Sequence, residues 1–327
     1  MSTPGINLTA NRRLMASSQN NRIGVSLAVA GALCFSTKAV FVKLAYRLEV
    51  DTVTLLLLRM GLALPFYLIT WWLSSRKGTV KQWGTPRSWL LLVISAVLGY
   101  YLSSLLDFAG LQYIDASLER LILFIYPSLV AIMAHFWIGT KVKGREWITI
   151  GISYLGLILL FGKQLATLTW TPGFWTGVVL VLGCAFTFAL YLILSQQLIP
   201  VFGVMGFTSM SMIIACLSVI VHYGIQHGGS FHLQHYPWQV WAIALAMAFI
   251  ATVIPSYLVN MAIARIGAAK AAIIASVGPL STITLAHWLL GERLGLLQIV
   301  GGLCIVASIT FLSWQSKKKP VYEKNPD

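Results

Sequence analysis

Five ionisable side chains stand inside long runs of apolar residues: Lys38, Arg59, Asp107, Glu119 and Arg120. A charge in such surroundings costs about 2.5–3.5 kcal/mol on insertion scales and indicates function by default. The cations can hold a carboxylate or another anion, and Asp107 or Glu119 can carry a proton. Two interpretations stay open. Lys38 and Arg59 face a cavity and bind an anion, or they pair with the two carboxylates and hold helices together.

A helical face surrounds one of these carboxylates. Tyr100, Ser103, Ser104 and Asp107 follow the spacing i, i+3, i+4 and i+7, so a helix places them on one side. Such a face is typical of a polar cavity lining. It fits a salt bridge from Asp107 to Arg120 equally well.

Four further residues are candidates for the same cavity. Tyr126 and Asn260 are polar residues deep in apolar runs, and we expect both to contact a substrate. Pro127 and Pro279 each remove a backbone hydrogen bond, and a proline bends or interrupts a helix. We expect both prolines to act as hinges or to shape the cavity.

The apolar runs dominate the composition. Of the 327 residues, 58% are hydrophobic and 10% are charged, whereas a soluble domain has about 45–50% apolar and about 25% charged residues. These values exclude a soluble two-domain enzyme. No run alternates in the way that a membrane β-barrel requires, so the sequence predicts an all-α integral membrane protein. A crossing takes about 20 residues, which predicts ten transmembrane helices at 23–46, 51–73, 88–112, 116–138, 145–162, 173–197, 203–225, 237–263, 268–290 and 293–314.

The positions of the basic residues predict the orientation. If the amino terminus lies in the cytoplasm, three of the 23 Lys and Arg residues lie at outer ends, namely Arg47, Lys163 and Arg293. The cytoplasmic ends then hold Arg12, Arg13, Arg22, Arg76, Lys77, Lys81, Arg87, Lys141, Lys143, Arg145, Arg265, Lys270, Lys317, Lys318, Lys319 and Lys324. Because Lys and Arg concentrate on cytoplasmic loops, we expect both termini to be cytoplasmic. The net charge of +14 then comes from basic residues at the cytoplasmic ends of the helices, next to the lipid bilayer. We expect no nucleic-acid partner.

An internal repeat relates the two halves of the chain. A shift of 152 residues places 109–139 on 261–291, and Pro127, His135 and Gly139 meet Pro279, His287 and Gly291. Each half holds five predicted helices. Because five crossings end on the opposite side of the membrane, the second half has the inverted orientation. Inverted repeats are typical of secondary transporters, whose substrate site lies near the midplane between the halves. We expect a disordered cytoplasmic tail at 1–22, repeats at 23–162 and 173–315, and a basic cytoplasmic tail at 316–327.

Several motifs resemble the drug/metabolite transporter superfamily, specifically its ten-helix EamA-type members. They are Leu58-Arg59-Met60, the run from Ala109 to Ala116, Ala264-Arg265-Ile266-Gly267-Ala268, and Pro279 followed by Leu290-Gly291-Glu292-Arg293. The resemblance covers about residues 23–315. It implies a central cavity between helices 1–4 and 6–9, with helices 5 and 10 at the periphery.

Two features depart from that family pattern. Gly139-Thr140-Lys141 lacks the acidic residue of the second repeat, and Phe35-Ser36-Thr37-Lys38 places a cation where the family usually has a Trp and small polar residues. The family implies export or exchange of small metabolites, often amino acids.

The sequence as a whole therefore predicts a multi-pass transporter of the cytoplasmic (inner) membrane. We expect it to export a small polar metabolite, an amino acid or an organic anion, by alternating access, with protons or a counter-substrate as a further partner. No nucleotide loop, metal cluster or nucleophile–base pair is recognisable, so we expect no enzyme activity, cofactor or metal site. The alternative is an integral-membrane transferase, or another non-transport protein, built on a duplicated helical bundle.

Overall fold

The structure, a computed structural model, describes residues 8–76, 84–139, 143–166, 172–229, 233, 236–279 and 295–315. Within these residues every regular element is a helix. The first half contains α1 (Leu8–Ser36), α2 (Lys38–Tyr46), α3 (Thr52–Arg76), α4 (Pro86–Ala96), the π-helix η1 (Val97–Leu102), α5 (Ser103–Tyr113), α6 (Ala116–Leu123), α7 (Tyr126–Ile138) and α8 (Gly144–Ala166). The second half contains α9 (Phe174–Phe202), α10 (Val204–Gln226), α11 (Trp238–Ala248), the π-helix η3 (Phe249–Val253), α12 (Ile254–Ile266), α13 (Ala268–Ile274), the 3₁₀ helix η4 (Ala275–Val277) and α15 (Leu296–Gln315).

The helices confirm a multi-pass membrane protein. Seven continuous helical stretches are long and apolar enough to cross a bilayer, and two shorter apolar helices lie at Ala268–Val277 and Ile299–Ser308. The count of ten crossings and the side of each terminus stay predictions. One expectation is wrong: α1 begins at Leu8, so residues 8–22 are helical and not a disordered tail.

The two halves repeat in structure with the offset found in the sequence. The helices α3, α4, α6 and α8 begin at 52, 86, 116 and 144, and α10, α11, α13 and α15 begin at 204, 238, 268 and 296. Each pair is 152 residues apart, as from 52 to 204, and we call such pairs repeat mates. The π-helices follow the same rule, because they begin at Val97 and Phe249.

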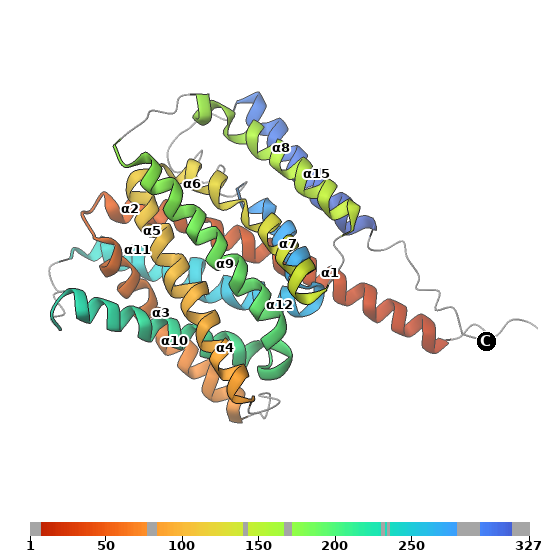
Figure 1. The fold of residues 1–327 in the computed structure, drawn as a ribbon, viewed down its shortest axis with the longest axis horizontal. Coiled ribbons are helices and arrows are strands. Elements are labelled where there is room, and N and C mark those ends of the chain that lie inside the picture. The colour runs from red at the N-terminus through yellow and green to blue at the C-terminus, as the bar shows by residue number, and fades with distance from the viewer. Residues whose placement is uncertain are drawn as a thin grey trace, which may run out of the picture.

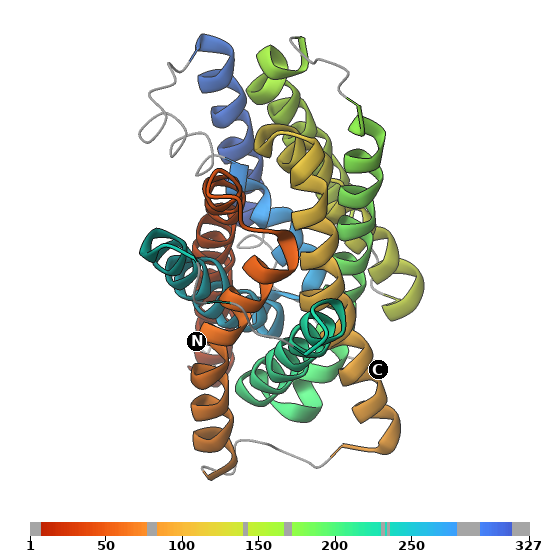
Figure 2. The same ribbon diagram turned by 90° about the vertical axis from the view of Figure 1, so that its left-hand side faces the viewer.

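Repeat mates run antiparallel where they touch. Thr70, late in α3, contacts Ser209, early in α10, while Met60 of α3 contacts Cys216 further along α10. The helices α8 and α15 are also antiparallel repeat mates in contact, and they lie together at one edge of the bundle (Figures 1 and 2). Opposite directions of equivalent helices are what an inverted repeat requires.

Close approach of small residues holds the central helices together. α1 packs on α12 with Gly31 against Val259, and the equivalent pair α9 and α5 meets with Gly177 against Gly110. Small residues let membrane helices approach closely, because lipid offers no hydrophobic drive for them to associate. At η1, a Cβ on Gly99 would overlap the ring of Tyr191.

Helix breaks lie next to the charged residues. The first predicted helix divides at Thr37, whose hydroxyl donates to the carbonyl of Cys34, so α2 begins at Lys38. The fourth divides at Phe124 and Ile125, and Pro127 is the second residue of α7. Because proline needs no backbone partner in a first helical turn, Pro127 begins a new helix rather than bending a continuous one. Its action as a hinge stays a prediction.

Candidate functional site

A buried ion pair joins two of the predicted site residues. Lys38 Nζ lies 2.7 Å from Asp107 Oδ2, with side-chain exposures of 3% and 0%. The helix break at Thr37 places Lys38 at the start of α2, and Asp107 lies one turn into α5. The contact is close but does not have hydrogen-bond geometry, so Asp107 is held by charge. The predicted alternative, a bridge from Asp107 to Arg120, does not form.

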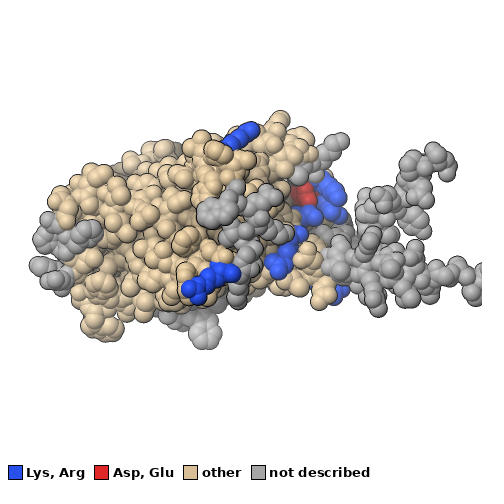
Figure 3. Space-filling model, turned by 90° about the horizontal axis from the view of Figure 1, so that it is seen from below, with Lys and Arg blue, Asp and Glu red and all other residues tan. Residues whose placement is uncertain are grey.

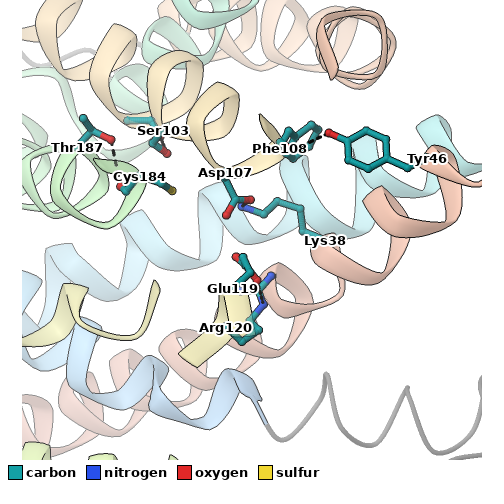
Figure 4. A network of polar contacts seen from close by, with 10 residues as sticks. Lys38, Tyr46, Ser103, Asp107, Phe108, Glu119, Arg120, Cys184 and Thr187 are labelled. Carbon is teal, nitrogen blue, oxygen red and sulfur yellow. Dashed lines mark hydrogen bonds and ion pairs between the residues drawn. The ribbon is translucent and has the colours of Figure 1, made fainter. Parts of the chain in front are cut away.

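A second ion pair lies beside the first. Arg120 Nε is 3.2 Å from Glu119 Oε2, and both side chains are buried on α6. The carboxyl groups of Asp107 and Glu119 face each other (Figure 4) and interact electrostatically. Two cations and two carboxyl groups from α2, α5 and α6 therefore form one charged cluster.

Arg59 is placed differently from the other cations. Its side chain is 1% exposed, and its Cζ lies 4.9 Å from the centroid of the Phe108 ring. Nε and Nη2 have no hydrogen-bond partner among the described residues, and Asp107 is the carboxylate that acts on Arg59 electrostatically. Arg59 therefore lies in the helix core beside Phe108, and a contact with substrate stays a prediction.

A cavity adjoins the charged cluster. Its interior leaves about 60 Å³ for the centre of a water-sized molecule. The predicted site residues Lys38, Arg120, Tyr126 and Pro279 are part of its wall. Most other wall residues are apolar, and they come from both halves of the chain: Ala28, Ala32, Phe35, Leu123, Phe124, Phe188, Leu192, Val259, Ala262, Ala271, Ala272 and Ala275.

The remaining predicted residues lie outside the cavity wall. Asn260 Nδ2 donates to the hydroxyl of Tyr191 at 2.8 Å and to Thr208 Oγ1 at 3.0 Å. The Tyr191 hydroxyl lies 3.3 Å from that of Tyr100. Ser104 is buried and also absent from the wall. Tyr100 therefore connects the two halves, whereas Asn260 connects three helices of the second half, α9, α10 and α12. Contact of either residue with substrate stays a prediction.

Sequence reasoning missed several wall residues. Phe35 and Ser36, the last two residues of α1, are in the wall. On α5 the wall serine is Ser103 and not the predicted Ser104, and α9 contributes Cys184. Figure 4 shows Ser103 and Cys184 near each other, beyond Asp107. The 152-residue offset was a usable signal, because it makes Phe188 of α9 the repeat mate of Ser36 of α1, and both residues are in the wall.

The surface of the protein separates charge from apolar residues. On the face shown in Figure 3, the described Lys and Arg side chains lie mostly toward one end of the molecule, and none is visible at the opposite end. Exposed apolar side chains cover the outward faces of α3, α8 and α15, as a lipid-facing surface requires. Among the described residues, no three His, Cys, Asp or Glu side chains gather to hold a metal ion.

Comparisons with known proteins agree with this architecture. The uncharacterized transporter YcbK of Bacillus subtilis (strain 168) is 30% identical over 302 residues, which cover 90% of this chain and 94% of YcbK. The uncharacterized transporter YyaM of the same organism is 22% identical over 251 residues, covering 77% of this chain and 81% of YyaM. A crystal structure superposes with a TM-score of 0.69 at 14% identity, covering 90% of this chain and 98% of the other, which shows a shared fold. The model of the EamA-like transporter family matches residues 22–162 and again 175–314, so the chain belongs to the EamA-like transporter family, within the drug/metabolite transporter superfamily.

Proposed function

We propose that this multi-pass membrane protein is a secondary transporter that exports a small polar metabolite, an amino acid or an organic anion, by alternating access. Its family and its named relatives support membrane transport. The observation that carries the finer proposal is the cavity between the two halves, whose wall contains the cations Lys38 and Arg120. Secondary transporters with inverted repeats bind substrate at this position.

The antiparallel repeat mates support alternating access. Two halves with the same fold and opposite direction can exchange their conformations, which opens the cavity to one side and then to the other. The breaks at Thr37 and at Phe124–Ile125 lie beside the cavity wall, where such a movement would change the helix geometry.

Counterflow in proteoliposomes tests this proposal. Purified protein is reconstituted, the vesicles are loaded with one unlabelled metabolite at a time, and the entry of a labelled trace of the same compound is followed. We expect saturable counterflow for at least one amino acid or organic anion, and none in protein-free vesicles. Absence of counterflow across a broad panel of both classes contradicts the proposal.

The facing carboxyl groups of Asp107 and Glu119 support proton coupling, because a carboxyl group in a transporter core can bind and release a proton. A pH dye trapped in the vesicles measures it. We expect the internal pH to change when substrate is added outside. Counterflow that leaves the pH unchanged favours a counter-substrate in place of protons.

A further inference from the structure

The charges around the cavity do not balance. Counted with both carboxyl groups ionised, the two ion pairs of the charged cluster balance each other, and Arg59 adds a third formal positive charge beside them. Nearer the end of the bundle, Lys43 and Asp115 add one formal charge of each sign, and Lys43 acts electrostatically on Glu119 as well as on Asp115. Among the described residues, the charged cluster and Arg59 together therefore have a formal excess of one positive charge.

The cations and the carboxylates occupy different depths. Lys38 and Arg120 belong to the cavity wall, whereas Asp107 and Glu119 are absent from it and are 0% exposed. An occupant of the cavity thus meets two cations first, with the carboxylates behind them. An ammonium group placed there would face charges of its own sign before it reached a carboxylate.

The rest of the wall favours an apolar occupant. The rings of Phe35 and Phe188 stack at a centroid distance of 5.7 Å, and Tyr126 meets Phe188 edge-on at 5.4 Å. Lys38 Nζ lies 4.8 Å from the centroid of Phe35. Aromatic surface and positive charge are therefore adjacent.

We propose that the substrate is a small organic monoanion with an apolar body. Its one negative charge contacts Lys38 and Arg120, and its apolar part packs against Phe35 and Phe188. This inference rests on the proposed function and narrows it: an organic anion without an ammonium group is preferred to a zwitterionic amino acid. One negative charge neutralises the excess, whereas a neutral or zwitterionic ligand leaves it and a dianion reverses it.

Binding of four matched aromatic probes tests the charge preference. Isothermal titration calorimetry on the purified full-length protein compares benzoate, benzamide, phenylalanine and isophthalate, which have one negative charge, no charge, a zwitterion and two negative charges. We expect benzoate to bind roughly tenfold or more tightly than the others, because like charges placed together and uncompensated charge both weaken binding. Phenylalanine or isophthalate binding as tightly as benzoate overturns the inference.

Changing the cluster charge should change the preferred probe. Glu119→Gln raises the excess to two positive charges, so isophthalate should bind more tightly than benzoate. Arg59→Met removes the excess, so benzoate should lose its advantage over benzamide. Arg47→Met is the matched control: like Arg59→Met it removes one cation, but from the exposed C-terminal cap of α2 outside the wall, and it should leave the ranking of the probes unchanged.

The ratio of affinities within one variant does not depend on the folded fraction, so partial misfolding lowers the signal and leaves the ranking intact. If Glu119→Gln yields no folded protein, Asp107→Asn makes the same charge change. A ranking that stays fixed across the folded variants overturns the inference.

The inference and the proposed function can fail separately. Saturable counterflow of phenylalanine by a protein that does not bind benzoate retains the transporter and rejects the monoanion. The expected ranking of probes with no counterflow of any compound retains the monoanion site and rejects the transporter.

Discussion

Lys38 can serve substrate binding and helix packing at once, because its ammonium group contacts Asp107 and Lys38 is also a residue of the cavity wall. A double-mutant cycle separates these roles. Removing one partner of a buried ion pair costs about 3–5 kcal/mol, while replacing both by apolar residues is often neutral. We therefore expect Lys38→Met to lower both stability and transport, and Lys38→Met combined with Asp107→Leu to restore stability without transport.

Thermal unfolding in detergent and counterflow in vesicles measure the two effects. Arg47→Met serves as the control, since Arg47 is the exposed C-terminal cap of the same helix and lies outside the wall. A double variant that transports as well as the unmodified protein would show that Lys38 only joins helices.

Asn260 has a structural role that can be tested in the same way. Its amide bonds to Tyr191 and Thr208 in the core. Asn260→Leu should lower stability by about 1–3 kcal/mol, because two buried hydroxyl groups lose a partner. The ratio of benzoate to benzamide affinity should not change, since Asn260 is not part of the cavity wall. Loss of stability is read from thermal unfolding, and a changed ratio would place Asn260 in the binding site.

At the scale of the helices, glycine packing joins α8 to α15. A Cβ on Gly156 would lie 2.7 Å from Ile305 Cγ1 and 2.8 Å from the carbonyl oxygen of Gly301, whereas a Cβ on Gly151 meets nothing within 4 Å. Gly156→Ala should destabilise the protein by about 1–3 kcal/mol through overpacking. Gly151→Ala, on the same helix, should be neutral or stabilise by up to about 1 kcal/mol.

The midpoint of thermal unfolding distinguishes the two alanine variants. Because α8 and α15 contribute nothing to the described cavity wall, both variants should keep the affinity for benzoate. Equal midpoints would contradict the close packing of this pair of helices.

The arrangement of these elements was only partly visible in the sequence. Run lengths and the 152-residue offset predicted where helices lie and which are equivalent, and the starts of α3 and α10 at Thr52 and Val204 follow that offset. The breaks at Thr37 and the π-helices were not predicted. They depend on contacts between helices, such as Tyr191 against Gly99, and an apolar run carries no signal of them.

The same limit applies to the site. Lys38, Asp107, Glu119 and Arg120 were found because an ionisable residue is conspicuous in an apolar run. The sequence did not show which of them pair, because the pairing depends on how each helix is rotated about its axis. It left a bridge from Asp107 to Arg120 possible, whereas the structure pairs Asp107 with Lys38. The rotation of α3 likewise explains why Arg59 packs against Phe108 and is not in the cavity wall.

For the molecule as a whole, the inverted repeat and the positions of Lys and Arg predict that both termini are cytoplasmic. Single cysteines placed in a variant lacking Cys34, Cys184, Cys216 and Cys304 test this in intact cells with a membrane-impermeant maleimide. Ser2→Cys and Ser316→Cys probe the two tails, and Gln226→Cys probes the end of α10.

We expect Gln226→Cys to react in intact cells, because α10 begins on the cytoplasmic side in this topology and ends at the outer face. The cysteines at positions 2 and 316 should react only after the membrane is permeabilised, since an even number of crossings returns the chain to its starting side. Labelling of one tail alone in intact cells would require an odd number of crossings. Such a result would leave the antiparallel contacts of α3 with α10 but would reject five crossings in each half.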